Sequence, residues 1–348
     1  MTKKTRVFLF GAVGVLLVGL AGGLIAYLAY NRGAASPSGL PPEVRYVPSN
    51  AEVVAFADVH AVMNSELRKE LMPSIEARSR KGRQMMNDFA GVDLEKQVNR
   101  VVAYVEPYTP ADPQAQDRPE FPRALMLVQG TFEGARIEQS IRDRGGEMQE
   151  YNGRKIFVHR EHQEEVAVGL VGPDLFAIGQ ADLVRRAVDR ARDGSGAAQD
   201  ITTNAEMMNL IHDAAGSTAW VVGQFDAVRR RMRLPDNVSS QVPPVRLVSV
   251  KATVNGGMKA TIRAETGDKA AADQLRDVVR GFVSLARLQG GSGAPQFEST
   301  LKSIELSGTD TTVQMSFAIA PDTLRMLAPG PREPSSPTNP PNPPPSDR

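Results

Sequence analysis

An uninterrupted apolar stretch near the amino terminus, residues 7–30, constrains this chain more than any other feature, because no charged residue interrupts it. As a helix rising about 1.5 Å per residue it would reach ~36 Å, enough to cross a hydrocarbon layer of about 30 Å with some tilt. The stretch therefore predicts a single membrane-spanning helix in contact with the lipid bilayer. The rest of the chain is then a domain held at a membrane.

The charges around this stretch predict its orientation. Three cations lie just before it, Lys3, Lys4 and Arg6, whereas only Arg32 follows closely. By the positive-inside rule, residues 1–6 lie in the cytoplasm and the domain lies on the periplasmic or extracellular side of a bacterial inner membrane. A cleaved secretory signal is the alternative, since residues 33–35 are small, but its apolar region spans only about 7–15 residues. The length favours a retained signal anchor.

Two glycines inside the stretch, Gly19 and Gly23, are four residues apart. Such spacing lets two membrane helices pack closely, which predicts a possible homodimer through these residues. The alternative is that glycine is simply common in membrane helices.

The composition excludes several classes of function. The net charge of the 348 residues is +1, so no overall field attracts nucleic acid, and we expect no nucleic-acid partner. Cysteine is absent, which excludes disulfides, thiol nucleophiles and cysteine-based metal sites. Hydrophobic residues make up 41% and charged residues 23%, values typical of a globular protein.

Shifts in composition divide the chain into seven segments. They are a cytoplasmic basic end (1–6), the transmembrane helix (7–30), a Gly/Ser/Pro linker (31–45), a first α+β repeat (46–192), a connector (193–216), a second α+β repeat (217–328) and a Pro-rich disordered tail (329–348).

Within the first repeat, the pattern predicts a strand at 52–57 and a helix starting at Asp58, whose apolar stripe is Met63, Leu67, Leu71 and Ile75. Strands at 100–105 and 124–130 and a helix at 133–144 follow. Asn152-Gly153 predicts a type I′ turn between strands 147–151 and 154–159. A second hairpin (166–171 and 175–179) and a helix at 182–192 complete this repeat.

The second repeat has the same order of patterns, after a weak helix at 205–212. A strand at 221–226 runs into a helix, and strands at 246–254 and 259–265 precede a helix at 268–288. A closing hairpin (300–306 and 312–319) and a helix beginning at Pro321 end the unit. The predicted fold class is therefore α+β, with the transmembrane helix followed by two repeated units of antiparallel sheet with helices on one face.

Sequence signatures of catalysis are missing. No nucleophile elbow, phosphate-binding loop, dinucleotide motif or zinc-protease motif occurs. His159 and His162, followed by Glu164 and Glu165, are too few for a zinc site on an exposed hairpin end. Asp58 and Asp226 hold matching places in the two repeats and could act as acid and base, but they fit helix N-caps equally well. We therefore expect no catalytic, cofactor-binding or metal-binding residues.

Two stretches resemble a known group of sequences: Val47-Pro48-Ser49-Asn50-Ala51 before the first strand and Gly91-Val92-Asp93-Leu94-Glu95-Lys96-Gln97-Val98 before the next. Together with the apolar anchor, they resemble uncharacterised bacterial membrane-anchored envelope proteins that carry a domain of unknown function. The resemblance covers mainly residues 46–190. It departs where that group often has a Pro-Trp-Leu-Gly-like stretch and this chain has Asn99-Arg100-Val101-Val102. The resemblance implies location and architecture, and no catalytic residues.

These observations predict a membrane-anchored extracytoplasmic binding or scaffolding module of the bacterial cell envelope, without catalysis, whose partner is an envelope protein. The alternative is a membrane-tethered hydrolase or metal-dependent enzyme with a site between the repeats. A third reading, a protein that binds a lipid or a glycan, would require a deep apolar pocket.

Overall fold

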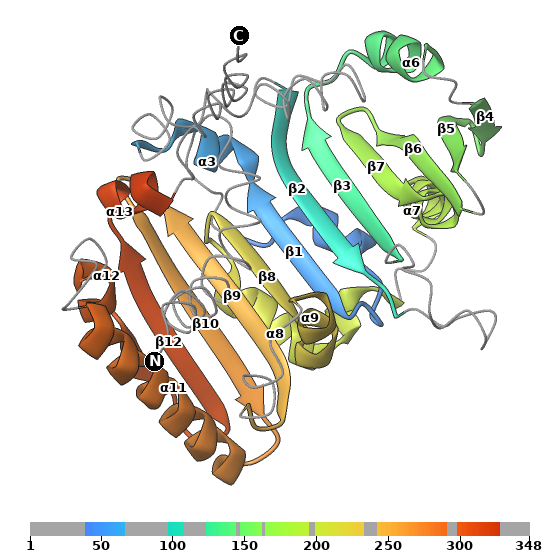
Figure 1. Ribbon diagram of the computed structural model, residues 1–348. Coiled ribbons are helices and arrows are strands. Elements are labelled where there is room, and N and C mark those ends of the chain that lie inside the picture. Colours follow the sequence, from blue (N-terminus) through green and yellow to red (C-terminus); the bar gives the residue numbers. More distant parts are fainter. Residues whose placement is uncertain are drawn as a thin grey trace, which may run out of the picture.

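The computed structural model describes residues 39–66, 97–107, 123–143, 147–161, 164–194, 199–232, 242–290 and 298–327 (Figure 1). None of the helices in this described part is both long and apolar enough to cross a membrane. The predicted anchor (7–30), the part of the predicted apolar stripe that follows Met63, and the predicted tail (329–348) lie outside the described residues.

The described strands form one antiparallel sheet of twelve strands. In order across the sheet they are β11 (Glu305–Ser307), β12 (Thr312–Ile319), β10 (Met258–Thr266), β9 (Val245–Val254), β8 (Ala219–Gln224), β1 (Val53–Asp58), β2 (Val98–Val105), β3 (Ala124–Gly130), β7 (Leu175–Gln180), β6 (Glu164–Gly172), β5 (Arg154–Glu161) and β4 (Glu147–Tyr151).

The prediction of two separate sheets was wrong, because β1 and β8 pair with each other at the centre. Ala55 lies opposite Val221, and Phe56 lies opposite Trp220. Each of these strands would otherwise leave an edge of unpaired N–H and C=O groups, and pairing the two edges satisfies both. The strand order reads β1-β2-β3-β7-β6 outward on one side and β8-β9-β10-β12-β11 on the other.

We name the two faces of the sheet after two adjacent residues of β1, whose side chains point to opposite sides: the Phe56 face and the Ala55 face.

The described helical segments are η1 (Pro42–Tyr46), α3 (Val59–Asn64), α6 (Gly134–Arg142), α7 (Ala181–Asp193), η4 (Ile201–Thr203), α8 (Ala205–Ala214), α9 (Phe225–Met232), α11 (Lys269–Gly290), α12 (Glu298–Lys302) and α13 (Pro321–Leu327).

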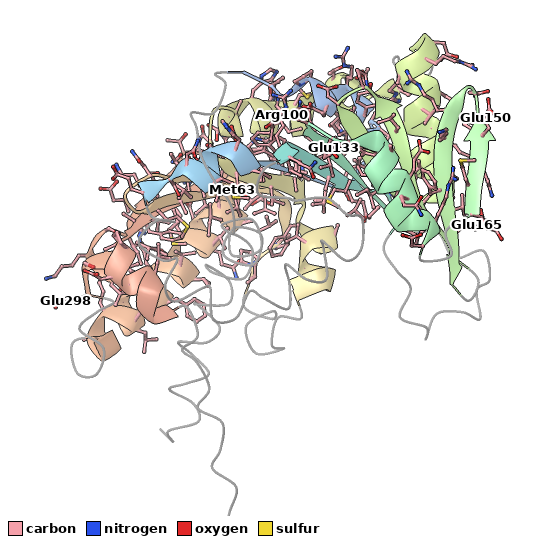
Figure 2. All side chains as sticks on the ribbon, turned by 90° about the horizontal axis from the view of Figure 1, so that it is seen from above. Met63, Arg100, Glu133, Glu150, Glu165 and Glu298 are labelled. Atoms are coloured by element: carbon pink, nitrogen blue, oxygen red, sulfur yellow. The ribbon has the colours of Figure 1, made fainter. Side chains whose placement is uncertain are left out.

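Helices cover both faces, so the prediction of helices on one face was also wrong. Segments η1, α7, η4 and α8 pack their apolar residues with Val54 and Phe56 in the largest core cluster. In contrast, α3 and α6 pack against the Ala55 face of β2, β3 and β7, and α11, α12 and α13 pack against the same face of β10 and β12. Figure 2 views the molecule from above, with Arg100 on the Phe56 side and Met63 on the Ala55 side.

The main core lies between the Phe56 face and its helices. Trp220 is 1% exposed and stacks on Phe56 with ring centroids 5.6 Å apart. The predicted helix at 182–192 is confirmed as α7, and its Leu183 and Val188 are buried in this core, whereas Ala191 is exposed.

Two further local predictions had opposite outcomes. The type I′ turn is confirmed, because Asn152 and Gly153 have φ values of 51° and 74°. The predicted strand at 300–306 is wrong in its first half. There the chain forms the short helix α12, and only Glu305–Ser307 pairs with β12.

Candidate binding face

The two aspartates considered as an acid–base pair do not lie together. Asp58 is buried and accepts a hydrogen bond from the backbone N–H of Ala61 at 2.6 Å, so it caps α3 as one interpretation held. Asp226 lies in the first turn of α9, past the N-cap position, and is exposed beside Arg229. The β1–β8 ladder separates the two residues by ~20 Å, given about 3.3 Å per residue. No acid–base pair forms from them.

The predicted histidine candidates give no metal site in the described residues. Within them no group of three or more histidine, aspartate or glutamate side chains could hold a metal ion. His162 lies outside the described residues, and the backbone of His159 belongs to β5. The remaining two, His60 and His212, are exposed on α3 and α8.

The most buried carboxylates hold elements together. Glu106, 4% exposed, accepts hydrogen bonds from Arg186 of α7 at 2.8 Å and from Arg123 at 3.1 Å. Glu43 of η1, equally buried, pairs with Arg100 of β2 at 3.0 Å. Both carboxylates have all their strong contacts with guanidinium groups inside the fold, which makes them structural ion pairs and not reactive groups.

The Ala55 face carries one row of apolar residues that crosses every strand of the described sheet. Each member lies directly opposite the next in the strand register. From one edge to the other the row is Leu306, Met315, Ile262, Val250, Val221, Ala55, Ala103, Met126, Ile178, Val168, Phe157 and Met148. No polar side chain interrupts it.

The equivalent row on the Phe56 face has a different chemistry. On β11, β12, β10 and β9 it consists of Glu305, Ser316, Thr261 and Lys251. From Trp220 to Ile156, where α7 and α8 cover it, the row has no polar side chain, and it ends at Gln149 on β4. Where no helix covers this face, the side chains are polar, as expected of a solvated sheet surface.

On the central strands, the Ala55 face is apolar but only part of it is buried, at Ala57, Val128 and Ala219. Eight side chains there are only partly buried, and we call them the apolar floor: Val53, Ala55, Val101, Ala103, Val105, Ala124, Met126 and Val221. Their neighbours on the other face, such as Val54, Val102 and Leu127, are completely buried. The floor is therefore apolar and less completely buried than the opposite face of the same strands, which makes it a candidate interaction surface.

Helix α11, which packs on β10 and β12, carries a second apolar flank. Its buried side packs on the sheet through Ala272, Leu275 and Ala286. A different flank carries Val278 and Phe282, both partly buried, and then the exposed Leu285 and Leu288, 41% and 78% exposed. These positions follow one another at helical spacing, so they form one stripe.

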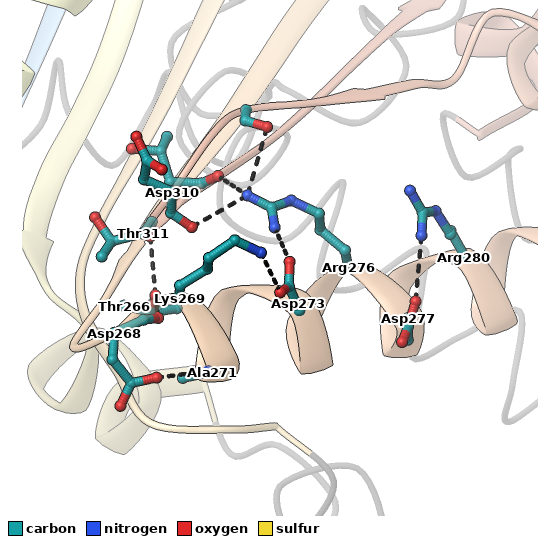
Figure 3. A network of polar contacts seen from close by, with 12 residues as sticks. Thr266, Asp268, Lys269, Ala271, Asp273, Arg276, Asp277, Arg280, Asp310 and Thr311 are labelled. Carbon is teal, nitrogen blue, oxygen red and sulfur yellow. Dashed lines mark hydrogen bonds and ion pairs between the residues drawn. The ribbon is translucent and has the colours of Figure 1, made fainter.

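The polar contacts of α11 fix the direction in which this stripe faces. Arg276 donates to the carbonyl oxygens of Gly308, Asp310 and Thr312 beside the β11 edge, at 3.4, 3.3 and 2.9 Å (Figure 3). Arg287 donates to the carbonyls of Leu301 and Ile304 on the same side. Since the arginines face the sheet edge, the opposite flank with Phe282 and Leu285 faces the centre of the sheet.

This face was not among the predicted features, although the sequence carries a signal of it. The strands 53–57 and 219–222 are apolar at successive positions, which is the pattern of a strand covered on both faces, and not of one that alternates. The predicted strands, 52–57 and 221–226, were treated as ordinary strands at the start of each repeat, and the second begins two residues earlier, at Ala219. The register that aligns twelve strands could not be read from single segments.

Comparisons with known proteins give no family. No family model matches the sequence, and no curated protein matches it. Among solved structures, crystal form I of TP0453 is similar at 9% identity and a TM-score of 0.45, covering 84% of this chain and 98% of that chain. Crystal form IV of TP0453 gives 11%, 0.44, 87% and 98%. At these TM-scores the similarity carries no argument about function.

Proposed function

We propose that this chain is a membrane-tethered binding module of the bacterial cell envelope that holds an apolar partner on the apolar floor, without catalysis. One observation carries the proposal. The Ala55 face of the central strands carries aliphatic side chains that are only partly buried. In contrast, the Phe56 face of β12, β10 and β9 carries polar side chains. An aliphatic face is stabilised when an apolar surface covers it.

The predicted anchor supplies the location. If residues 7–30 span the bilayer, residues 31–41 connect them to η1, and eleven residues reach at most ~40 Å. The domain would then stay close to the membrane surface, within reach of lipids and of other envelope proteins.

A photocrosslinking experiment tests this proposal. A benzophenone amino acid replaces Ala103 in the full-length protein in its native membrane, with the same replacement at Ser316 as the control. Ser316 is also partly buried, but lies on the Phe56 face of β12. We expect irradiation to join position 103, and not position 316, to a molecule other than this chain. Equal labelling at both positions, or adducts within one chain only, would contradict the proposal.

A further inference from the structure

We infer that β4 pairs with β4 of a second copy of this chain, so that two molecules join their sheets edge to edge. Strand β4 lies at one end of the described sheet (Figure 1). It pairs with β5 on one side, and no other described strand pairs with it. An edge strand with an unpaired side is a template for a further strand. This edge lies apart from the apolar floor, so the inference goes beyond the proposed function.

The two edges of the described sheet differ in what they offer to a partner. The opposite edge, β11, has only three residues, and Arg276 occupies the carbonyl oxygens of Gly308 and Asp310 in the turn that follows it. In contrast, β4 has five residues, most of them exposed, and its Met148 side chain is 48% exposed. Strand β4 is therefore the more accessible edge.

Side-chain contacts with α7 hold β4 in its extended form. The hydroxyl of Tyr151 donates to Asp189 at 2.9 Å, and Arg185 donates to the side-chain oxygen of Gln149 at 3.1 Å. Because the strand is already fixed in place, it loses little conformational freedom when another strand pairs with it.

The outward backbone groups of β4 belong to Met148 and Glu150. A two-residue turn joins β4 to β5, and the pair that flanks such a turn, Tyr151 and Arg154, exchanges hydrogen bonds. Hydrogen-bonded pairs alternate along an antiparallel ladder, so Gln149 also bonds towards β5. The N–H and C=O groups of Met148 and Glu150 therefore point away from the sheet.

One antiparallel register uses all of these outward groups. It places Met148 opposite Glu150 of the second copy and Glu150 opposite Met148 of the second copy, so each strand donates two hydrogen bonds and accepts two. Gln149 then lies opposite its own equivalent, on a two-fold axis. Charged side chains often protect an edge from pairing. In this register, however, Glu147 and Glu150 lie opposite Tyr151 and Met148 of the second copy, and not opposite other carboxylates.

The symmetry of this pair keeps both membrane tethers on one side. Opposed side chains of an antiparallel pair point to the same face, so the Phe56 faces of the two copies lie on the same side of the joined sheet. Segment η1, which follows the predicted anchor and linker, packs on this face through Val44 and through the ion pair of Glu43 with Arg100. Both chains thus enter from the same side, as two copies anchored in one membrane require. This agreement favours a second copy over an unrelated extended peptide.

The predicted anchor would strengthen a short contact. A strand of five residues buries little surface, so we expect the pairing to be weak in dilute solution. Confinement of two anchored copies to one membrane raises their effective concentration. Close packing of the predicted membrane helices through Gly19 and Gly23 would act in the same direction.

Disulfide formation between single cysteines tests the inference, because the natural chain has no cysteine. Gln149→Cys is introduced into the full-length protein in its native membrane, oxidised with copper phenanthroline and analysed by non-reducing electrophoresis. Directly opposed residues bring their Cβ atoms to about 5 Å, which is close to disulfide geometry. Ser307→Cys, an exposed position on the opposite edge, is the control.

We expect Gln149→Cys to form a covalent dimer at least tenfold faster than Ser307→Cys. Glu150→Cys should react severalfold more slowly than Gln149→Cys, because the two equivalents of position 150 lie on a diagonal about 7–8 Å apart. Adding Glu150→Pro to Gln149→Cys should slow the reaction at least tenfold. Proline removes an outward N–H group and no hydrogen bond of the β4–β5 ladder. The emission of Trp220 reports whether each variant is folded.

Equal rates at positions 149 and 307 would overturn the inference, and so would a faster reaction at position 150 than at position 149. An unchanged rate in folded Glu150→Pro would overturn it as well. If Glu150→Pro does not fold, the comparison of positions 149, 150 and 307 decides. Photocrosslinking at position 103 tests the proposed function separately: a dimer through β4 without capture at position 103 would contradict that function and leave this inference standing.

Discussion

At the scale of single residues, buried polar groups position the elements that shape the sheet. Glu106 lies at the end of β2 and joins Arg123, just before β3, to Arg186 of α7. Arg123 also pairs with Asp182 in the first turn of α7. This cluster fixes α7 over the Phe56 face.

Removing the central carboxylate should destabilise the fold. Glu106→Ala leaves two guanidinium groups without their buried partner, so we expect the free energy of unfolding to fall by about 2–3 kcal/mol, less than for a fully buried pair because Arg186 is half exposed. Urea titration of the full-length protein in detergent measures the change. Glu298→Ala, which removes an exposed pair with Lys302, is the control and should leave the free energy of unfolding nearly unchanged, because solvent screens this pair. Equal effects would show that the Glu106 cluster is not structural.

The buried phenol of Tyr104 should make the protein less stable at alkaline pH. Burial raises the pKa of its phenol well above the usual value, with a further contribution from the carboxylate of Glu106. The unfolded chain releases this proton first, so the stabilising contribution is complete below pH 10 and is lost as the pH rises towards the folded-state pKa. The slope should reach about 1.4 kcal/mol per pH unit for this residue. Unfolding measured from pH 9 to 11 should show a flatter dependence in Tyr104→Phe; an unchanged slope would contradict this account.

At the scale of elements, local patterns in the sequence were sufficient for most strands and helices. The Asn152-Gly153 turn, the strand 124–130 and the helix beginning at Pro321 follow from turn chemistry, alternation and helix-start preferences. The strand predicted at 300–306 failed because α12 takes its first residues, and a tertiary contact decided between the two: Leu301 packs against the β10–β12 core. Local preference cannot anticipate such a contact.

Close backbone approach makes one strand-end glycine irreplaceable. A Cβ atom at Gly130 would lie 1.8 Å from the carbonyl oxygen of Gln97, so Gly130→Ala forces β3 away from the residue before β2. We expect a loss of about 3 kcal/mol or more in unfolding free energy, by the overpacking of a site that cannot relax. Gly134→Ala, at the start of α6 with nothing within 4 Å of the added Cβ, is the matched control and should change stability by under about 1 kcal/mol. Similar losses for both variants would contradict the assigned register of β2 and β3.

At the scale of the whole molecule, the junction of β1 and β8 turns two halves into one sheet. The main core contains residues from both halves, including Val54, Phe56, Trp220 and Val222. Sequence patterns predicted an antiparallel sheet in each half, but the pairing of two apolar strands from distant parts of the chain, which joins them into one sheet, depends on long-range register. For the same reason, the apolar row on the Ala55 face becomes visible only when all strands are aligned.

A shared core predicts that the two halves unfold together. Trp220 is the only tryptophan of the chain and lies at the junction, so its fluorescence reports on the junction alone. We expect its urea transition to coincide with the loss of far-ultraviolet circular dichroism, as in a two-state protein. Two separate transitions would show that the halves are independent units.

The most direct test of the central claim, that the apolar floor is occupied in the native membrane, is the accessibility of single cysteines. The natural chain has no cysteine, so Ala103→Cys and Ser316→Cys each introduce one thiol, on opposite faces and both partly buried. Reaction with a water-soluble maleimide is followed in native membranes and again after purification and delipidation. We expect position 103 to react at least tenfold more slowly than position 316 in the membrane, and at a similar rate once lipids and partners are removed. Equal rates in the native membrane would contradict the claim.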